Sequence, residues 1–340
     1  MEKTVGKQSI RFEEAIHLIS AASIAGKKEG EGPLGKLFDK ISADPCFGME
    51  TWEKAESAMQ RSAVETALEK AGMESKAVRF LFGGDLLGQL IATSFGAEEL
   101  GIPFFGLYGA CSTCGESLAL AAMTVAAGFG DPVMAVTSSH FGGAEKQFRF
   151  PLEYGNQRPL SATWTVTGAG AFLLSKKGGR VRIPEVTIGK VVDYGVKDSL
   201  NMGACMAPAA ADTIERNLED LGREPEDYDR IITGDLGYVG KQILLDLLKG
   251  RSIDIKEQHM DCGIEIFDRE SQDTHSGGSG CGCSAVTLAA LILPKLTSGE
   301  WKRVLFVPTG ALLSTVSYNE GQSVPGIAQG VMVEYAGKEE

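Results

Sequence analysis

The chain has 340 residues, of which 43% are hydrophobic and 23% charged, and its formal net charge is −12. This composition is typical of a globular protein with one large domain or two closely packed ones. The acidic balance excludes the basic surface that duplex nucleic acid requires, so we expect no nucleic-acid partner.

Seven cysteines are present, an odd number that argues against a disulfide framework and for a reducing compartment. Their close pairs are C-x-x-C at 111–114 and C-x-C at 281–283, which do not form the two knuckles of a zinc ribbon, so we expect no metal site. The N-terminus lacks the apolar run of a secretory signal, and the longest apolar stretch, 117–129, is too short to span a bilayer. We therefore expect any membrane association to be peripheral.

In chain order, the first half of the sequence has an amphipathic helix at 55–71 and a short apolar strand that ends in Gly-Asp-Leu at 84–86. The second half repeats this pattern with a helix at 209–221 and a strand that ends in Gly-Asp-Leu at 234–236. Three such matches occur in the same order at similar offsets, and they predict a duplicated chain. The polar glycine turn near 175–180 divides it into an N-terminal half, 1–178, and a C-terminal half, 179–340.

The alternation of strands and helices predicts an α/β fold with largely parallel sheets and right-handed crossovers. Two helices, around 118–127 and 288–293, are apolar on every side, which is typical of helices buried between layers. Two buried helices between two sheets predict a five-layered α-β-α-β-α sandwich.

The segment 106–128, "GLYGACSTCGESLALAAMTVAAG", places Cys111 between a glycine-containing turn and one of these buried helices. A thiol at a helix start faces the positive end of the helix dipole and free backbone N–H groups, so we expect a lowered thiol pKa. The same N–H groups could bind an anion.

This segment resembles the nucleophile helix of the thiolase superfamily, in which an alanine-cysteine pair opens a buried helix that ends at a glycine. The strand "TVTGAGAFLLS" at 165–175 resembles the end of the first half in that superfamily. The resemblance implies that Cys111 occupies the nucleophile position. However, the loop at 231–240, "IITGDLGYVG", has Asp235 where ketoacyl synthases have a histidine, and the asparagine motif and second cysteine of thiolases are missing. Because an activating base is needed for covalent catalysis, we expect no enzymatic activity.

Two histidines could still face a pocket. His275, in "DTHSGGSGCGCSA", lies roughly where thiolases carry a catalytic histidine; otherwise it is a loop residue. His140 follows a predicted strand, at the carboxyl end where sites in α/β folds gather; otherwise it is a hydrogen-bonded turn residue.

At the level of whole motifs the chain resembles the stage V sporulation protein AD family. The motifs include "SSHFGGAEKQFRFPLEYG" at 138–155, "MAPAAADTI" at 206–214 and "GGSGCGCSA" at 277–285. The resemblance implies a non-catalytic protein without a cofactor that binds dipicolinic acid and helps to move it, with calcium, into the developing spore. It also implies a peripheral location at the inner membrane of the forespore or spore, beside membrane proteins of the same transport system.

Dipicolinate is a flat ring with two carboxylates, so its site needs N–H donors, arginine or lysine, and a flat apolar wall. The candidate ligand-binding residues are Cys111, His140, Arg149, Arg158, Asp235 and His275. The alternative for the segment that holds both arginines is a solvated loop with inward-facing aromatic side chains. The sequence leaves open whether the free acid or its calcium chelate is bound.

By analogy of fold we expect a homodimer that pairs through an edge strand of the first half. Two other functions remain open. One is an active acyltransferase of the thiolase or ketoacyl synthase type with Cys111 as nucleophile, and the other is a scaffold that only bridges membrane partners.

Overall fold

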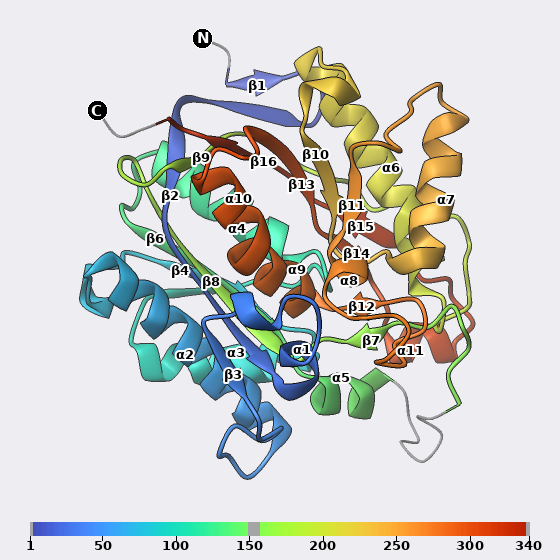
Figure 1. Ribbon diagram of the computed structural model, residues 1–340, viewed down its shortest axis with the longest axis horizontal. Coiled ribbons are helices and arrows are strands. Elements are labelled where there is room, and N and C mark those ends of the chain that lie inside the picture. The colour runs from blue at the N-terminus through green and yellow to red at the C-terminus, as the bar shows by residue number, and fades with distance from the viewer. Residues whose placement is uncertain (1–2, 149–156, 338–340) are drawn as a thin grey trace.

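The computed structural model describes residues 3–148 and 157–337. Within them, one twisted mixed sheet of twelve strands runs through the molecule (Figure 1). Its main path is β11 (His259–Asp261), β10 (Arg230–Thr233), β13 (Arg303–Val307), β16 (Gly330–Tyr335), β9 (Val181–Thr187), β2 (Ser9–Gly26), β8 (Gly168–Ser175), β6 (Val133–Ser139), β4 (Leu81–Gly84) and β5 (Phe104–Gly106). Two short strands, β1 (Thr4–Val5) and β3 (Lys40–Ser42), pair with β2 outside this path.

The long strand β2 joins the sheets of the two halves. Its first part pairs antiparallel with β9, from Ser9 to Leu18, and its last part pairs antiparallel with β8, from His17 to Ala25. The two sheets that the sequence predicts are therefore continuous through one strand of 18 residues.

The helices form three layers around this sheet. The outer helices of the first half are α2 (Trp52–Ala71) and α3 (Ile91–Leu100), and those of the second half are α6 (Met202–Leu221) and α7 (Gly237–Lys249). The central helices are α4 (Thr113–Ala126), α9 (Cys281–Thr287) and α10 (Leu293–Thr297). A π-helical turn, Leu288–Ile292, precedes α10. Leu118 of α4 and Val286 of α9 share one core with Phe172 of β8 and Phe306 of β13, so the central helices lie between the two parts of the sheet. The expected α-β-α-β-α arrangement is confirmed.

Both long outer helices begin and end with the same local signals. The Thr51 side chain caps α2 by accepting from the Lys54 N–H, and the Asn201 side chain caps α6 by accepting from the Ala204 N–H. Each helix ends at a glycine with positive φ, a conformation that side chains disfavour. Helix α6 starts earlier than the apolar period predicts because the cap at Asn201 lies before the periodic stretch.

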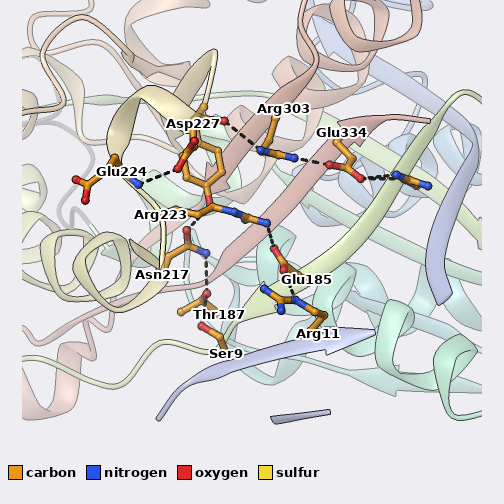
Figure 2. Close-up of polar contacts among 12 residues, drawn as sticks. Ser9, Arg11, Glu185, Thr187, Asn217, Arg223, Glu224, Asp227, Arg303 and Glu334 are labelled. Atoms are coloured by element: carbon orange, nitrogen blue, oxygen red, sulfur yellow. Dashed lines mark hydrogen bonds and ion pairs between the residues drawn. The ribbon is translucent and has the colours of Figure 1, made fainter. Parts of the chain in front are cut away.

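A polar network ties β2 to the second half, as Figure 2 shows. Glu185 of β9 is 2% exposed, and its two oxygens lie 2.6 Å from Arg11 Nε of β2 and 2.6 Å from Arg223 Nη2. Next to it, the Asn217 amide donates to Thr187 Oγ1 at 2.8 Å, and Thr187 Oγ1 lies 2.9 Å from Ser9 Oγ. A buried carboxylate between two guanidinium groups is compensated, so this network has a structural role that needs no ligand.

Short elements link the halves where the central helices begin. Strand β7 (Trp164–Thr165) pairs parallel with β12 (Gly278–Ser279), and β14 (Thr309–Ala311) pairs with β15 (Gly326–Ala328). The remaining helices of the described residues are α1 (Lys27–Gly30), α5 (Phe141–Phe148), α8 (Cys262–Glu265) and α11 (Thr315–Asn319). Single turns of 3₁₀ helix lie at 35–37, 75–77, 88–90 and 225–227. The residues on these links and on α5 surround Cys111.

The described helices include none that is both long enough and apolar enough to pass through a bilayer.

Candidate functional site

A small cavity lies beside Cys111, where the two halves of the chain meet. Its walls are mostly apolar and come from Leu86, Tyr108, Ala110, Cys111, Ala144, Glu145, Phe148, Thr165, Met202, Ser279, Ala311 and Leu313. The cavity has a volume of about 30 Å³, which is room for about two water molecules. We call it the Cys111 pocket.

Cys111 lies two positions before Thr113, the first residue of α4. Ala110 has a φ of 50°, a left-handed conformation that is rare for a residue with a side chain and that turns the chain sharply before the helix. The Cys111 side chain is 6% exposed, and its Sγ lies 4.0 Å from Ser279 Oγ.

The expected lowering of the Cys111 pKa is wrong. Burial, followed by the negative charge of the neighbouring Asp235, raises the pKa of the Cys111 thiol well above its usual value. The helix start provides only a partial positive charge. This charge does not offset the cost of a thiolate that would be buried away from water and next to a carboxylate. The thiol therefore stays protonated at neutral pH.

Asp235 lies after β10 and is completely buried. One carboxylate oxygen accepts from Ser279 Oγ at 2.9 Å and from the Gly280 N–H at 2.9 Å, and the other accepts from Thr309 Oγ1 at 2.7 Å. Burial raises the pKa of Asp235, and these donors act in the opposite direction. Asp235 thus lies next to Cys111 as expected, but three hydrogen bonds hold its carboxylate in place.

The two candidate histidines do not line the Cys111 pocket. His140 is 3% exposed; its Nδ1 accepts from the Gly142 N–H at 3.1 Å, so Nε2 carries the proton and donates to the Pro45 carbonyl at 2.7 Å. His275 has a φ of 52°, and its ring lies 2.9 Å from the Pro159 carbonyl and 3.2 Å from an Asp273 oxygen. His140 therefore has the contacts of a hydrogen-bonded turn residue, and His275 has those of a loop residue. A role of either histidine in ligand binding stays a prediction that this geometry does not support.

Of the two candidate arginines, the structure describes only Arg158, and it does not line the pocket. Arg149 falls outside the described residues. The Arg158 side chain is 7% exposed, donates to the Asp273 carbonyl at 3.0 Å and stacks 4.8 Å from the centre of the Trp164 ring. Arg158 is absent from the lining of the Cys111 pocket.

Several pocket residues could not be found from the sequence. Tyr108 and Thr165 supply hydroxyls, and Phe148, Met202 and Leu313 supply apolar walls. Burial raises the pKa of Tyr108 to about 12, so this hydroxyl keeps its proton and can donate a hydrogen bond. These residues come from five separate segments, and no local motif signals that they meet. Ser279 and Phe148 had a signal, because Ser279 belongs to the glycine-rich run before α9 and Phe148 to the segment 138–155, whose aromatic residues lie among its basic ones.

Comparison with solved structures shows a fold shared with condensing enzymes. The 3-oxoacyl-[acyl-carrier-protein] synthase III of Aquifex aeolicus VF5 is 14% identical, with a TM-score of 0.57 over 94% of this chain and 100% of that chain. An OleA variant of Xanthomonas campestris is 15% identical, with a TM-score of 0.59 over 96% of this chain and 99% of that chain. At this identity the likeness concerns the thiolase-like fold and not the reaction.

Comparison of sequences is more specific. The stage V sporulation protein AD of Bacillus subtilis (strain 168) is 44% identical over 335 residues, which cover 98% of this chain and 99% of that protein. The sequence profile of stage V sporulation protein AD (SpoVAD) matches residues 6–334. With agreement along almost its whole length, the chain belongs to the stage V sporulation protein AD family.

Proposed function

We propose that the chain binds dipicolinic acid in the Cys111 pocket and supports its calcium-linked uptake into the developing spore, without catalysing acyl transfer. The observation that carries this proposal is that the Cys111 thiol lies next to the carboxylate of Asp235. The pocket keeps the cysteine of a condensing enzyme at the start of a buried helix, but the group beside the thiol is a carboxylate held by three donors. A thiol whose pKa is raised is a poor nucleophile and a suitable neutral wall for a ligand.

The walls of the pocket offer the flat apolar surface and the hydrogen-bond donors that a flat aromatic acid needs, and among the described residues no arginine or lysine lines it. Tyr108 and Phe148 offer ring surfaces, and the hydroxyls of Tyr108 and Thr165 can donate to a carboxylate. A cavity of about 30 Å³ is smaller than a pyridine dicarboxylate, so we expect Phe148, Met202 and Leu313 to move aside as the ligand enters. Their side chains lie at the pocket and belong to separate elements, so each can change rotamer independently.

Calorimetry with dipicolinate and with its calcium chelate tests this proposal. Replacing Cys111 by Ala removes a small wall residue and should weaken binding only modestly, whereas Cys111→Trp should fill the cavity and abolish binding. Cys46→Trp, at a half-buried loop cysteine away from the pocket, is the control and should bind like the parent. If Cys111→Trp binds dipicolinate as tightly as the parent, the ligand site is elsewhere.

An active acyltransferase is the alternative that one observation favours, namely that Cys111 directly follows the left-handed residue Ala110 before α4. Among the described residues, no histidine or lysine lines the pocket to activate the thiol. We therefore expect assays with acyl-CoA substrates to stay at background. Turnover that Cys111→Ser abolishes would establish the alternative.

We also propose that the protein acts at the inner membrane of the forespore or spore as a peripheral partner of the membrane proteins of the same transport system. Membership in the sporulation family supports this placement. A thermal-shift panel separates the proposal from a pure scaffold, because a scaffold without a ligand site should show no shift with dipicolinate or its calcium chelate.

A further inference from the structure

A pair of buried carboxyl groups lies behind the wall of the Cys111 pocket. Glu56 of α2 is 1% exposed, and Asp85, in the turn after β4, is fully buried. Within the described residues, no lysine, arginine or histidine forms an ion pair with either group. Two buried carboxylates without a cation would repel each other in a medium of low dielectric constant.

A chain of hydrogen bonds connects the two carboxyl groups. The Gln60 amide donates to Ser138 Oγ at 2.7 Å and to Thr93 Oγ1 at 2.8 Å. Ser138 Oγ in turn donates to Glu56 Oε1 at 2.7 Å, and Thr93 Oγ1 donates to Asp85 Oδ2 at 2.6 Å. Each hydroxyl has one hydrogen and the amide has two, so every donor in this chain is already used.

The number of donors differs sharply between the two acids. Asp85 accepts three hydrogen bonds, from the Leu87 N–H at 2.7 Å, the Thr93 N–H at 2.8 Å and the Thr93 hydroxyl. Glu56 accepts one, and its Oε2 is buried without a partner. Because donors stabilise the charged form, the negative charge belongs on Asp85 and the proton on Glu56. Burial and then the charge of Asp85 raise the pKa of Glu56 well above its ordinary value.

Both acids adjoin segments that form the Cys111 pocket. Asp85 directly precedes the wall residue Leu86. A Cβ added to Gly143 of α5 would lie 3.8 Å from Glu56 Oε2, and the next residue, Ala144, is a wall residue. Besides Asp85, the ionisable groups that interact electrostatically with Glu56 include Glu53 of α2 and Cys281 of α9, and the adjoining segment carries His140, Glu145 and Lys146. Of these, Lys146 is paired with Glu53, and the Cys281 thiol donates to the Ser138 carbonyl at 2.8 Å.

We propose that Glu56 holds a proton beneath the Cys111 pocket and that ligand binding requires this proton. Loss of the proton places a second negative charge in a buried site in which the donors of the hydrogen-bond chain already have acceptors. The site relieves that charge by separating α5 from the turn at 85–87 and by admitting water, which moves Leu86 and Ala144 apart and spoils the pocket. This proposal rests on the proposed function, because it makes binding at that same site proton-linked.

The main experiment measures dipicolinate affinity by calorimetry from about pH 6 to about pH 9 in the parent, in Glu56→Gln and in Glu69→Gln. Glutamine keeps the shape of Glu56, can accept from Ser138 and carries no charge. The parent should lose affinity by about tenfold per pH unit once Glu56 ionises, and Glu56→Gln should bind equally well across the range. Glu69→Gln changes an exposed acid on the same helix and should follow the parent. Equal slopes in the parent and in Glu56→Gln would overturn the proton linkage.

Two measurements without ligand test the proton itself. Infrared spectra should show a protonated-carboxyl band that Glu56→Gln removes, and its persistence in that variant would assign the proton to another group. The Tm of the parent should fall relative to that of Glu56→Gln as the pH rises. If no variant binds dipicolinate at any pH, the proposed function fails, while these ligand-free measurements still decide where the proton lies.

Discussion

Burial and the neighbouring carboxylate of Asp235 together raise the pKa of the Cys111 thiol. The oxygens of Asp235 are held by Ser279, Gly280 and Thr309, and its charge opposes the formation of a thiolate. The sequence predicted the position of both residues through the thiolase resemblance. The predicted lowering of the thiol pKa was wrong, because burial depends on residues from both halves.

Replacing Asp235 by Asn should make Cys111 more reactive. The amide oxygen can accept from Ser279 and Gly280, and the NH₂ group can donate to Thr309, so the fold should tolerate the change. Removing the neighbouring charge should lower the thiol pKa and speed alkylation of Cys111 at mildly alkaline pH by roughly tenfold or more. Peptide mass spectrometry can follow Cys111 apart from the other six cysteines, and Cys205, whose pKa is raised by burial and by its own acidic neighbour Asp198, is an internal control. An unchanged Cys111 rate would show that burial alone sets its pKa.

At the scale of elements, the buried side chain of Glu29 connects the short helix α1 to the start of α5. Glu29 is 1% exposed, and its Oε1 accepts from the Thr167 N–H at 3.0 Å. The Thr167 hydroxyl accepts from the Phe141 N–H at 3.0 Å, at the start of α5. Residues 27–31 are rich in charged side chains, and only the packing of α1 against β2 shows that Glu29 among them is buried.

This contact predicts a stability that depends on pH. Burial raises the pKa of Glu29 to about 7. A raised carboxyl pKa favours the folded state fully below the unfolded pKa of about 4.5, and this contribution is lost as the pH rises through about 7. Relative to Glu29→Gln, the parent should therefore lose stability on the order of 3 kcal/mol between these pH values and no more above them. Urea unfolding at several pH values measures this difference, with Glu31→Gln as the exposed control. A constant difference across the range would mean that Glu29 titrates normally.

At the scale of the molecule, strand β5 ends the sheet of the first half. Phe105 of β5 is 52% exposed on this edge although it stacks on Phe82 with ring centres 5.0 Å apart, and Phe95 of α3 is 55% exposed. An unpaired strand edge with apolar side chains favours association with another strand. We therefore propose that two copies pair through β5, as the analogy of fold predicted.

Light scattering should show a dimer at micromolar concentration. Phe105→Glu should shift the protein to a monomer, because it places a charge in the apolar contact. Leu160→Glu changes a side chain that is 80% exposed elsewhere and should leave the dimer intact. A parent protein that is monomeric at this concentration would reject the pairing.

Much of the architecture follows from the sequence alone. The amphipathic helices, the short buried strands and the two helices that are apolar on every side are local patterns, and burial of those patterns leads to the layered sandwich. The glycines that end α2 and α6 and the polar turn between the halves are likewise visible in the chain. Local patterns also marked Cys111 at a helix start.

The composition of the pocket was decided only by the tertiary structure. His140, Arg158 and His275 have suitable chemistry, but neighbouring carbonyls and Asp273 hold all three away from the cavity. Tyr108, Met202 and Leu313 lie far apart in the chain and meet at the pocket because α6 packs against β14 and β15 and because Gly310 of β14 lies against the turn before α4. The protonation states of Cys111 and Glu56 were also decided by the tertiary structure, since they depend on burial and on acidic side chains from other elements. Sequence periodicity reports which face of an element is buried, whereas a pocket and its charges depend on which buried faces meet.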